Sequence, residues 1–161
     1  MDRDTRKEII AAVEDFFERK GVKYKPFNER GMARATYGVK SKLKHVDVLF
    51  IASDDKLMVR SILPLEAGED ERAKVGEFLL RANYGLKIGG FDFDFNDGEI
   101  SYRVSLYCGD EEFAPPTFEQ IEYALIVNLM MVSKYGDALL KVLFGLVEPK
   151  DAIDEAESSA E

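Results

Sequence analysis

The sequence predicts a single α+β domain in which helices pack against an antiparallel sheet. Three observations lead to this prediction. Apolar residues recur at helical spacing in separate segments, they alternate with polar residues between those segments, and turn residues join several alternating segments into hairpins. The expected order of elements is α-β-β-β-(β)-α-β-β-α. A chain of 161 residues can bury enough surface to fold without disulfides or metals.

We expect a first helix that begins near Thr5 and ends at Gly21. Thr5 and Glu8 have the spacing of a capping box, and glycine is common just beyond a helix end. The apolar stripe of this helix consists of Ile9, Val13, Phe16 and Phe17. A second helix is expected at 69–84, with Gly85 as its stop. Its apolar stripe consists of Val75, Phe78, Leu79 and Ala82.

Alternating apolar and polar residues predict the strands. Those between the two helices are expected at 22–27, 33–39, 45–52 and 57–65, with a turn at 53–56. A clearer hairpin follows the second helix. Its apolar positions are Phe91, Phe93 and Phe95 before the turn and Ile100, Tyr102, Val104 and Leu106 after it. The turn residues Asn96, Asp97 and Gly98 tolerate the positive φ that a tight reversal requires.

A long third helix is expected from about Phe118 to Tyr135, with Thr117 and Gln120 as its capping box. Gly136 is expected to separate it from a second helical piece at 137–147. Apolar residues cover almost the whole circumference of the long helix. A helix with this pattern must be buried on two sides, and one sheet covers only one of them. We therefore expect a homodimer, whose interface residues would be Ile126, Val127, Met130 and Met131.

The C-terminal end is strongly acidic. A short segment begins at Pro149, ends in SSAE and is expected to fray. We assign 1–147 to the α+β domain and 148–161 to an acidic C-terminal helix and tail. Of the net charge of −9, residues 148–161 contribute −5, and nucleic-acid binding requires clustered basic residues, so no nucleic-acid partner is expected. The basic cluster at 40–44 (KSKLK) is expected to be a solvated hairpin turn and not a phosphate site.

Several features indicate a cytoplasmic protein. Cys108 is the single cysteine, which excludes an intramolecular disulfide and fits a reducing compartment. Residues 1–20 mix charged and apolar residues, so we expect no export signal. The longest apolar run, at 124–132, is far shorter than the ~20 residues that cross a bilayer, so no membrane partner is expected.

No catalytic, metal or cofactor site is expected. The acidic side chains from Asp92 to Glu99 suggest calcium, but a calcium loop that starts at Asp92 needs glycine and a carboxylate where Asp97 and Arg103 stand. His45 and Cys108 are the candidates for a nucleophilic dyad, yet no motif supplies a third orienting residue. The glycines of GLKIGG lie between a helix and a strand, the reverse of the order in a phosphate loop.

The sheet face away from the helices is expected to be partly apolar as well. In the strand at 45–52, Val46, Val48 and Phe50 alternate toward one face, which leaves other apolar residues on the opposite face. We expect that face to bind an extended segment of a partner protein, with two arginines as charged anchors. The predicted partner-binding residues are Leu49, Ile51, Met58, Arg60, Ile62 and Arg103.

Several segments together resemble the YbjN-domain family. They comprise Asn83 at the end of the second helix, Gly89, Gly90 and Phe91 at the start of the hairpin, Asp97, Gly98 and Glu99 at its turn, and Tyr102, Arg103 and Val104 after it. The segments KLKHVDVLF, LPLEAGEDER and LFGLVEPKDAIDEAE extend the resemblance over nearly the whole chain. The family is described as bacterial sensory transduction regulators and is similar in fold to type III secretion chaperones. The resemblance implies a homodimeric domain that holds a protein partner and has no catalytic residues.

These expectations combine into one main function and one alternative. We expect a non-catalytic, chaperone-like regulatory adaptor that binds a segment of a partner protein. The alternative is a sensory domain that responds to a small molecule or an ion. Its ligand would lie between the sheet and the helices or at the turn between Asp92 and Glu99.

Overall fold

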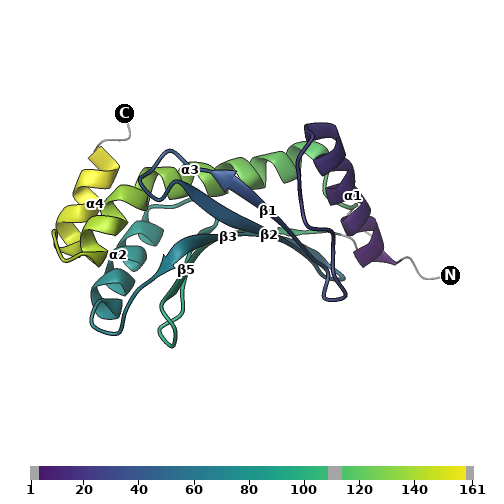
Figure 1. Cartoon of the computed structure of the whole chain (residues 1–161). Coiled ribbons are helices and arrows are strands. Elements are labelled where there is room, and N and C mark those ends of the chain that lie inside the picture. Colours follow the sequence, from purple (N-terminus) through teal and green to yellow (C-terminus); the bar gives the residue numbers. More distant parts are fainter. Residues whose placement is uncertain (1–3, 109–113, 159–161) are drawn as a thin grey trace.

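The computed structural model describes residues 4–108 and 114–158, which form four helices and a five-stranded antiparallel sheet (Figure 1). The helices are α1 (Thr5–Lys20), α2 (Arg72–Tyr84), α3 (Phe118–Leu143) and α4 (Pro149–Ser158). The strands are β1 (Met32–Gly38), β2 (His45–Ala52), β3 (Lys56–Glu66), β4 (Gly90–Phe93) and β5 (Glu99–Tyr107). Their order across the sheet is β1-β2-β3-β5-β4. The predicted α+β class is confirmed.

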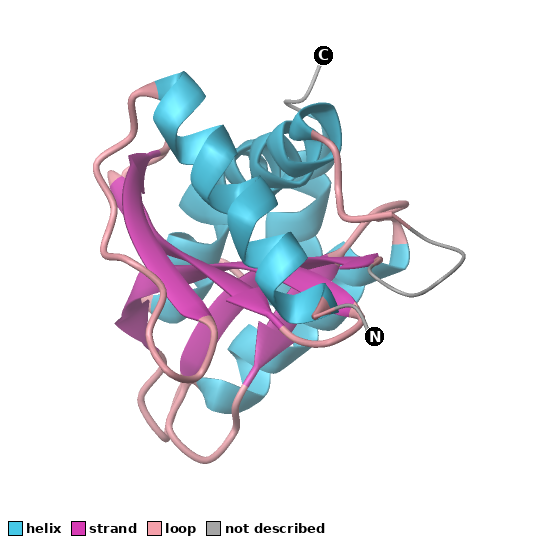
Figure 2. Ribbon diagram, turned by 90° about the vertical axis from the view of Figure 1, so that its right-hand side faces the viewer, coloured by secondary structure: helices cyan, strands magenta, loops and turns pink. Residues whose placement is uncertain are grey.

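One face of the sheet and the helices enclose the hydrophobic core. Helix α3 runs along this inner face, α1 packs at one end, and α2 and α4 lie at the other (Figures 1 and 2). The inner positions of the two central strands are occupied by Val46, Val48, Phe50, Leu57, Val59 and Leu63, all of which are buried. The predicted apolar stripes of α1 and α2 are buried too. Helical and strand periodicity therefore identified the core correctly.

Helix α1 confirms its predicted end and corrects its predicted start. Gly21 closes it with a φ of 65°, a conformation that favours glycine. The N-cap is Asp4 and not Thr5: the Asp4 carboxylate accepts a hydrogen bond from the Lys7 backbone N–H at 3.1 Å. The Thr5 hydroxyl instead donates to the carbonyl of Asp54, so it ties the helix to the β2–β3 turn.

Three segments between α1 and α3 are shorter than predicted. Residues 22–27 form a single bridge, Lys25 to Arg34, in place of the expected strand. Helix α2 begins at Arg72 instead of Glu69. Strand β4 ends at Phe93, so Phe95 lies outside the sheet, where its ring packs against that of Phe93.

Helix α3 continues through Gly136, so the predicted break is wrong. A Cβ on Gly136 would lie 2.5 Å from the Ser41 Oγ and 2.9 Å from a methyl carbon of Leu43. The glycine therefore allows the β1–β2 hairpin to approach the helix closely. Its low helix propensity costs about 1 kcal/mol, which the buried residues on both sides of it offset. The predicted capping box of Thr117 and Gln120 is present.

Helix α4 packs against α2 and α3, and its residues Ala152, Ile153 and Ala156 are buried. The expected fraying is thus wrong for 149–158, because these apolar positions give the acidic helix a buried face. Residues 159–161 lie outside the described part of the chain. None of the described helices is long and apolar enough to span a membrane.

Candidate protein-binding face

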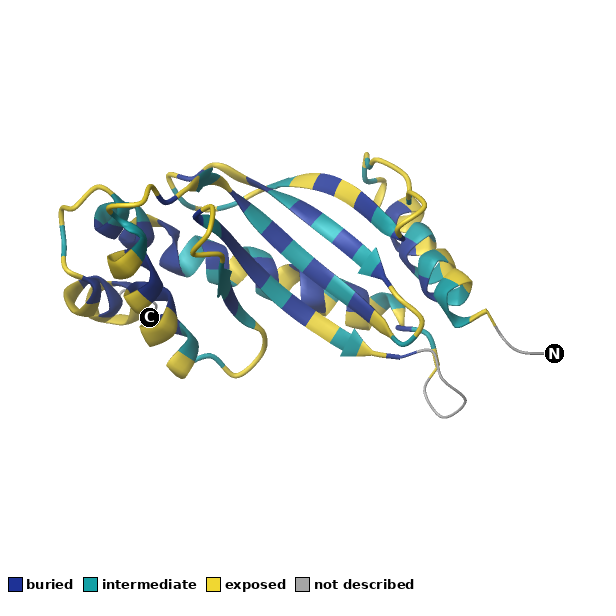
Figure 3. Cartoon of the chain, turned by 90° about the horizontal axis from the view of Figure 1, so that it is seen from below, coloured by how far each residue is buried: buried dark blue, intermediate teal, exposed yellow. Residues whose placement is uncertain are grey.

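The sheet face opposite α3, here called the outer face, is left open by the described helices (Figure 3). The strand register places its side chains in three neighbouring rows. The first row is Met32, Ile51, Met58 and Ser105, the second is Arg34, Leu49, Arg60 and Arg103, and the third is Thr36, Asp47, Ile62, Ser101 and Asp92. The structure therefore brings all six predicted partner-binding residues together.

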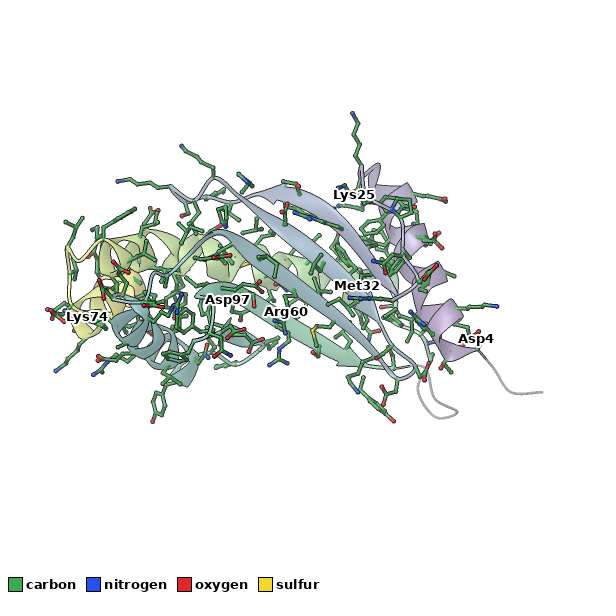
Figure 4. All side chains as sticks on the ribbon, turned by 60° about the horizontal axis from the view of Figure 1, so that its bottom comes forward. Asp4, Lys25, Met32, Arg60, Lys74 and Asp97 are labelled. Carbon is green, nitrogen blue, oxygen red and sulfur yellow. The ribbon has the colours of Figure 1, made fainter. Side chains whose placement is uncertain are left out.

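The four apolar residues of the predicted site are half-buried, although no described helix covers them. These residues are Leu49, Ile51, Met58 and Ile62. The sheet arches so that its concave side is the outer face, and Arg60 lies near the middle of that face (Figures 1 and 4). Neighbouring long polar side chains shield the apolar ones from water in part. The face is thus apolar between charged groups, with no stripe of fully exposed hydrophobic residues.

The two predicted anchors, Arg60 and Arg103, lie directly opposite each other on β3 and β5. Like charges in this arrangement repel. Asp92 on β4 offsets the repulsion: its Oδ2 lies 2.8 Å from the Arg103 Nε and 3.2 Å from an Arg60 Nη. The hydrogen bond from Arg103 to Asp92 is also the main reason that the pKa of Arg103 is raised. Two guanidinium groups therefore share one carboxylate.

A second ion pair, Arg34 with Asp47, lies at the β1–β2 end of the outer face. Asp47 also accepts a hydrogen bond from the Thr36 hydroxyl at 2.9 Å. Partial burial acts to raise the pKa of Asp47, but the hydrogen bonds from Arg34 and Thr36 outweigh it and lower that pKa. The sequence analysis missed this pair, which the alternation of β1 and β2 places on the outer face.

A shallow depression of about 510 Å³ lies on the outer face where β3, β5 and β4 meet. Its lining includes Arg60, Arg103 and Asp92 together with Phe93 and Phe95. Ser101 at its base accepts a hydrogen bond from Arg60 at 3.3 Å. Asp94 and Glu99 line the depression as well, so it combines two arginines and three carboxylates with aromatic surface.

The catalytic and calcium alternatives gain no geometric support. Cys108 is buried, its pKa is raised by that burial, and it lies beside the end of β2 opposite to His45, roughly 20 Å away at about 3.3 Å per strand residue. At the turn where calcium was considered, the carboxylates of Asp94 and Asp97 accept hydrogen bonds from backbone N–H groups of the turn. Within 4–108 and 114–158, no group of three or more acidic, histidine or cysteine side chains could hold a metal ion.

The residues expected at a dimer interface divide into two pairs. Ile126 and Met130 on α3 are 43% and 56% exposed, and Tyr123 in the same stripe is 53% exposed. Val127 and Met131 are partly buried and pack against the core. An exposed apolar stripe therefore exists on α3, but it is narrower than the sequence suggested.

The observed architecture, a five-stranded antiparallel sheet with helices on one face and the other face open, is a type III secretion chaperone-like fold. The chain belongs to the YbjN family. The model of that family, described as "Putative bacterial sensory transduction regulator", matches residues 10–141. No curated protein sequence matches the chain.

Solved structures resemble the chain at low sequence identity. E. coli YbjN, described as a "putative transcription regulator", has a TM-score of 0.55 and 11% identity, over 77% of this chain and 85% of that one. A chain of the HopA1–SchA chaperone–effector complex has a TM-score of 0.50 and 13% identity, over 83% and 96% of the two chains. A chain of the ExsC–ExsE complex has a TM-score of 0.41 and 17% identity, over 84% and 93%.

Proposed function

We propose that this protein is a non-catalytic regulatory adaptor that binds an extended segment of a partner protein on its outer face. The observation that carries the proposal is the open, concave face, on which half-buried apolar residues alternate with fixed arginines. The HopA1–SchA relative supports it at the level of the fold, because a domain of this architecture occurs in a chaperone–effector complex. We also propose a cytoplasmic location. Cys108 is a free, buried thiol, and free thiols are typical of proteins in a reducing compartment.

The rows of the outer face suggest how the segment would bind. Alternate side chains of an extended peptide point to the same side, so its apolar residues would contact Ile51, Met58 and Ile62. An acidic side chain between them would pair with Arg60 or Arg103, which share only Asp92 as an ion-pair partner among the described residues. The preferred partner segment is therefore an alternating apolar sequence that contains an acidic residue.

Site-specific photocrosslinking tests this mode of binding. A photoreactive residue at position 58 should crosslink a partner in cells, and mass spectrometry would identify the linked segment. Binding of that segment as a synthetic peptide should weaken by about tenfold or more with Ile51→Glu and Ile62→Glu, because each change places a buried charge against an apolar residue. Leu146→Glu is the matched control, since Leu146 is 73% exposed outside the outer face. Equal binding by all three variants would contradict the proposal.

We further propose that the protein is a homodimer whose interface is centred on Tyr123 and Ile126 of α3. Ile126→Lys should shift sedimentation from dimer to monomer and leave the melting curve nearly unchanged, because Ile126 contributes little to the core of its own chain. Leu146→Lys should sediment like the wild type. A wild-type chain that sediments as a monomer at high concentration would refute the dimer.

A further inference from the structure

A second hollow lies away from the outer face, between the β1–β2 hairpin, α3 and α4. Its volume is about 750 Å³, within the range of small-molecule sites. Side chains of two kinds line it. Met130, Met131 and Ala138 provide apolar surface, and four lysines also line the hollow. These lysines are Lys40, Lys42, Lys134 and Lys141. We call this hollow the lysine groove.

The hairpin that carries Lys40 and Lys42 is held firmly on α3. The Lys40 backbone N–H donates to the Ser133 Oγ at 2.9 Å, and the Lys42 backbone N–H donates to the Asp137 Oδ1 at 2.7 Å. Gly136 allows this close approach, which Figure 1 shows where the hairpin reaches α3. The predicted solvated turn is therefore a docked one. The backbone that carries its lysines is held in place before any ligand arrives, which lowers the entropic cost of binding.

The charges of the lysine groove are unbalanced. Its two carboxylates are already engaged: Asp137 accepts hydrogen bonds from the hairpin, and Glu155 pairs with Lys141. In the described part of the chain, no carboxylate pairs with the ammonium groups of the other three lysines. Lys134 lies 5.3 Å from the centre of the Tyr135 ring. A local surplus of positive charge thus stands out on a protein whose net charge is −9.

We propose that the lysine groove binds an organic anion with an apolar body. The phosphate or carboxylate head would lie among Lys40, Lys42 and Lys134, and the apolar body would contact Met130 and Met131. Methionine side chains adapt to irregular apolar ligands, which suits this surface. The site is separate from the outer face, so the protein would respond to a small molecule independently of the bound partner segment.

Calorimetric titration of the full chain with dodecyl phosphate, below its micelle-forming concentration, tests this proposal. We expect saturable binding of one molecule per chain. The double variant Lys42→Ala/Lys134→Ala should weaken it by about tenfold or more, because both charged contacts are lost. The control Lys87→Ala/Lys150→Ala removes the same charge outside the groove and should bind like the wild type. Thermal melts of both variants verify that they are folded.

Three further titrations sharpen the result. Titration with dodecanoate in place of dodecyl phosphate shows which head group binds more tightly. Binding of either compound supports the proposal if Lys42→Ala/Lys134→Ala weakens it. Inorganic phosphate should bind much more weakly, because it lacks the apolar body; equal binding would overturn the proposal. The variant Ile51→Glu should leave the titration unchanged, which separates this site from the outer face. Equal weakening by the groove and control variants, or no saturable binding, would also overturn it.

Discussion

The two faces of the central strands carry the same alternating pattern with opposite results. On the inner face, Phe50 and Val59 are completely buried beneath the helices. On the outer face, the adjacent residues Ile51 and Met58 are half-buried and lie among ion pairs. Both faces contain apolar residues, so hydrophobicity alone does not separate core from surface. The helices decide which face becomes the core, and the other face is available for a partner.

The largest expected difference between the faces is in stability. Phe50→Ala should lower the free energy of unfolding by about 3 to 5 kcal/mol, because it leaves a cavity next to the Phe17 ring. Ile51→Glu, one residue further along, should change it by less than about 1 kcal/mol. Urea unfolding measures both. Equal losses would mean that the outer face is packed as tightly as the core, and the proposed binding face would have to be abandoned.

A buried polar contact on the inner face comes next in expected size. The Asn128 amide on α3 donates to the carbonyls of Val59 and Ala124, and its oxygen accepts from the Ser61 hydroxyl at 2.8 Å. Asn128→Ala leaves the buried Ser61 hydroxyl without this partner and removes the two bonds from the amide, so it should cost about 2 to 3 kcal/mol in urea melts. A neutral result would indicate that water enters the site. The double variant Asn128→Ala/Ser61→Ala is the control, and should recover part of the loss.

The outer-face arginine cluster should give a smaller effect that depends on salt. Asp92→Ala leaves Arg60 opposite Arg103 without their shared carboxylate, so stability should fall by about 1 kcal/mol at low ionic strength. The loss should shrink at high salt, because the repulsion is then screened. Thermal melts at two salt concentrations test this, and Asp94→Ala, which lacks an arginine partner, is the matched control. A loss independent of salt would show that Asp92 acts through packing.

The smallest expected effect is the pH dependence of the Arg34–Asp47 pair. Because the folded pKa of Asp47 is lowered, its contribution to stability is present above the unfolded pKa of about 3.9 and is lost as pH falls through the folded value. Asp47→Asn should therefore be less stable than the wild type at pH 7, and the difference should disappear in acid. Urea melts at several pH values measure it. A difference that persists in strong acid would contradict the role of the charge.

Much of the fold could be read from local patterns. Period-two alternation placed β2 at its observed bounds, and the capping box of Thr117 and Gln120 marked the start of α3. The predictions failed where a distant segment decides the local structure. The low helix propensity of Gly136 predicts a helix break. The β1–β2 hairpin that packs against Gly136 lies far away in the sequence, so local patterns could not show that the helix continues.

Most elements, their apolar faces and hence the residues that share the outer face could be predicted from the sequence, because these features depend on spacing within a few residues. The tertiary structure alone decided which charges meet there. Arg60, Arg103 and Asp92 come from three strands, and Lys42 meets Asp137 across 95 positions of the chain. Local periodicity carries no information on such pairs, since they form only when the sheet register and the packing of helix on hairpin are set.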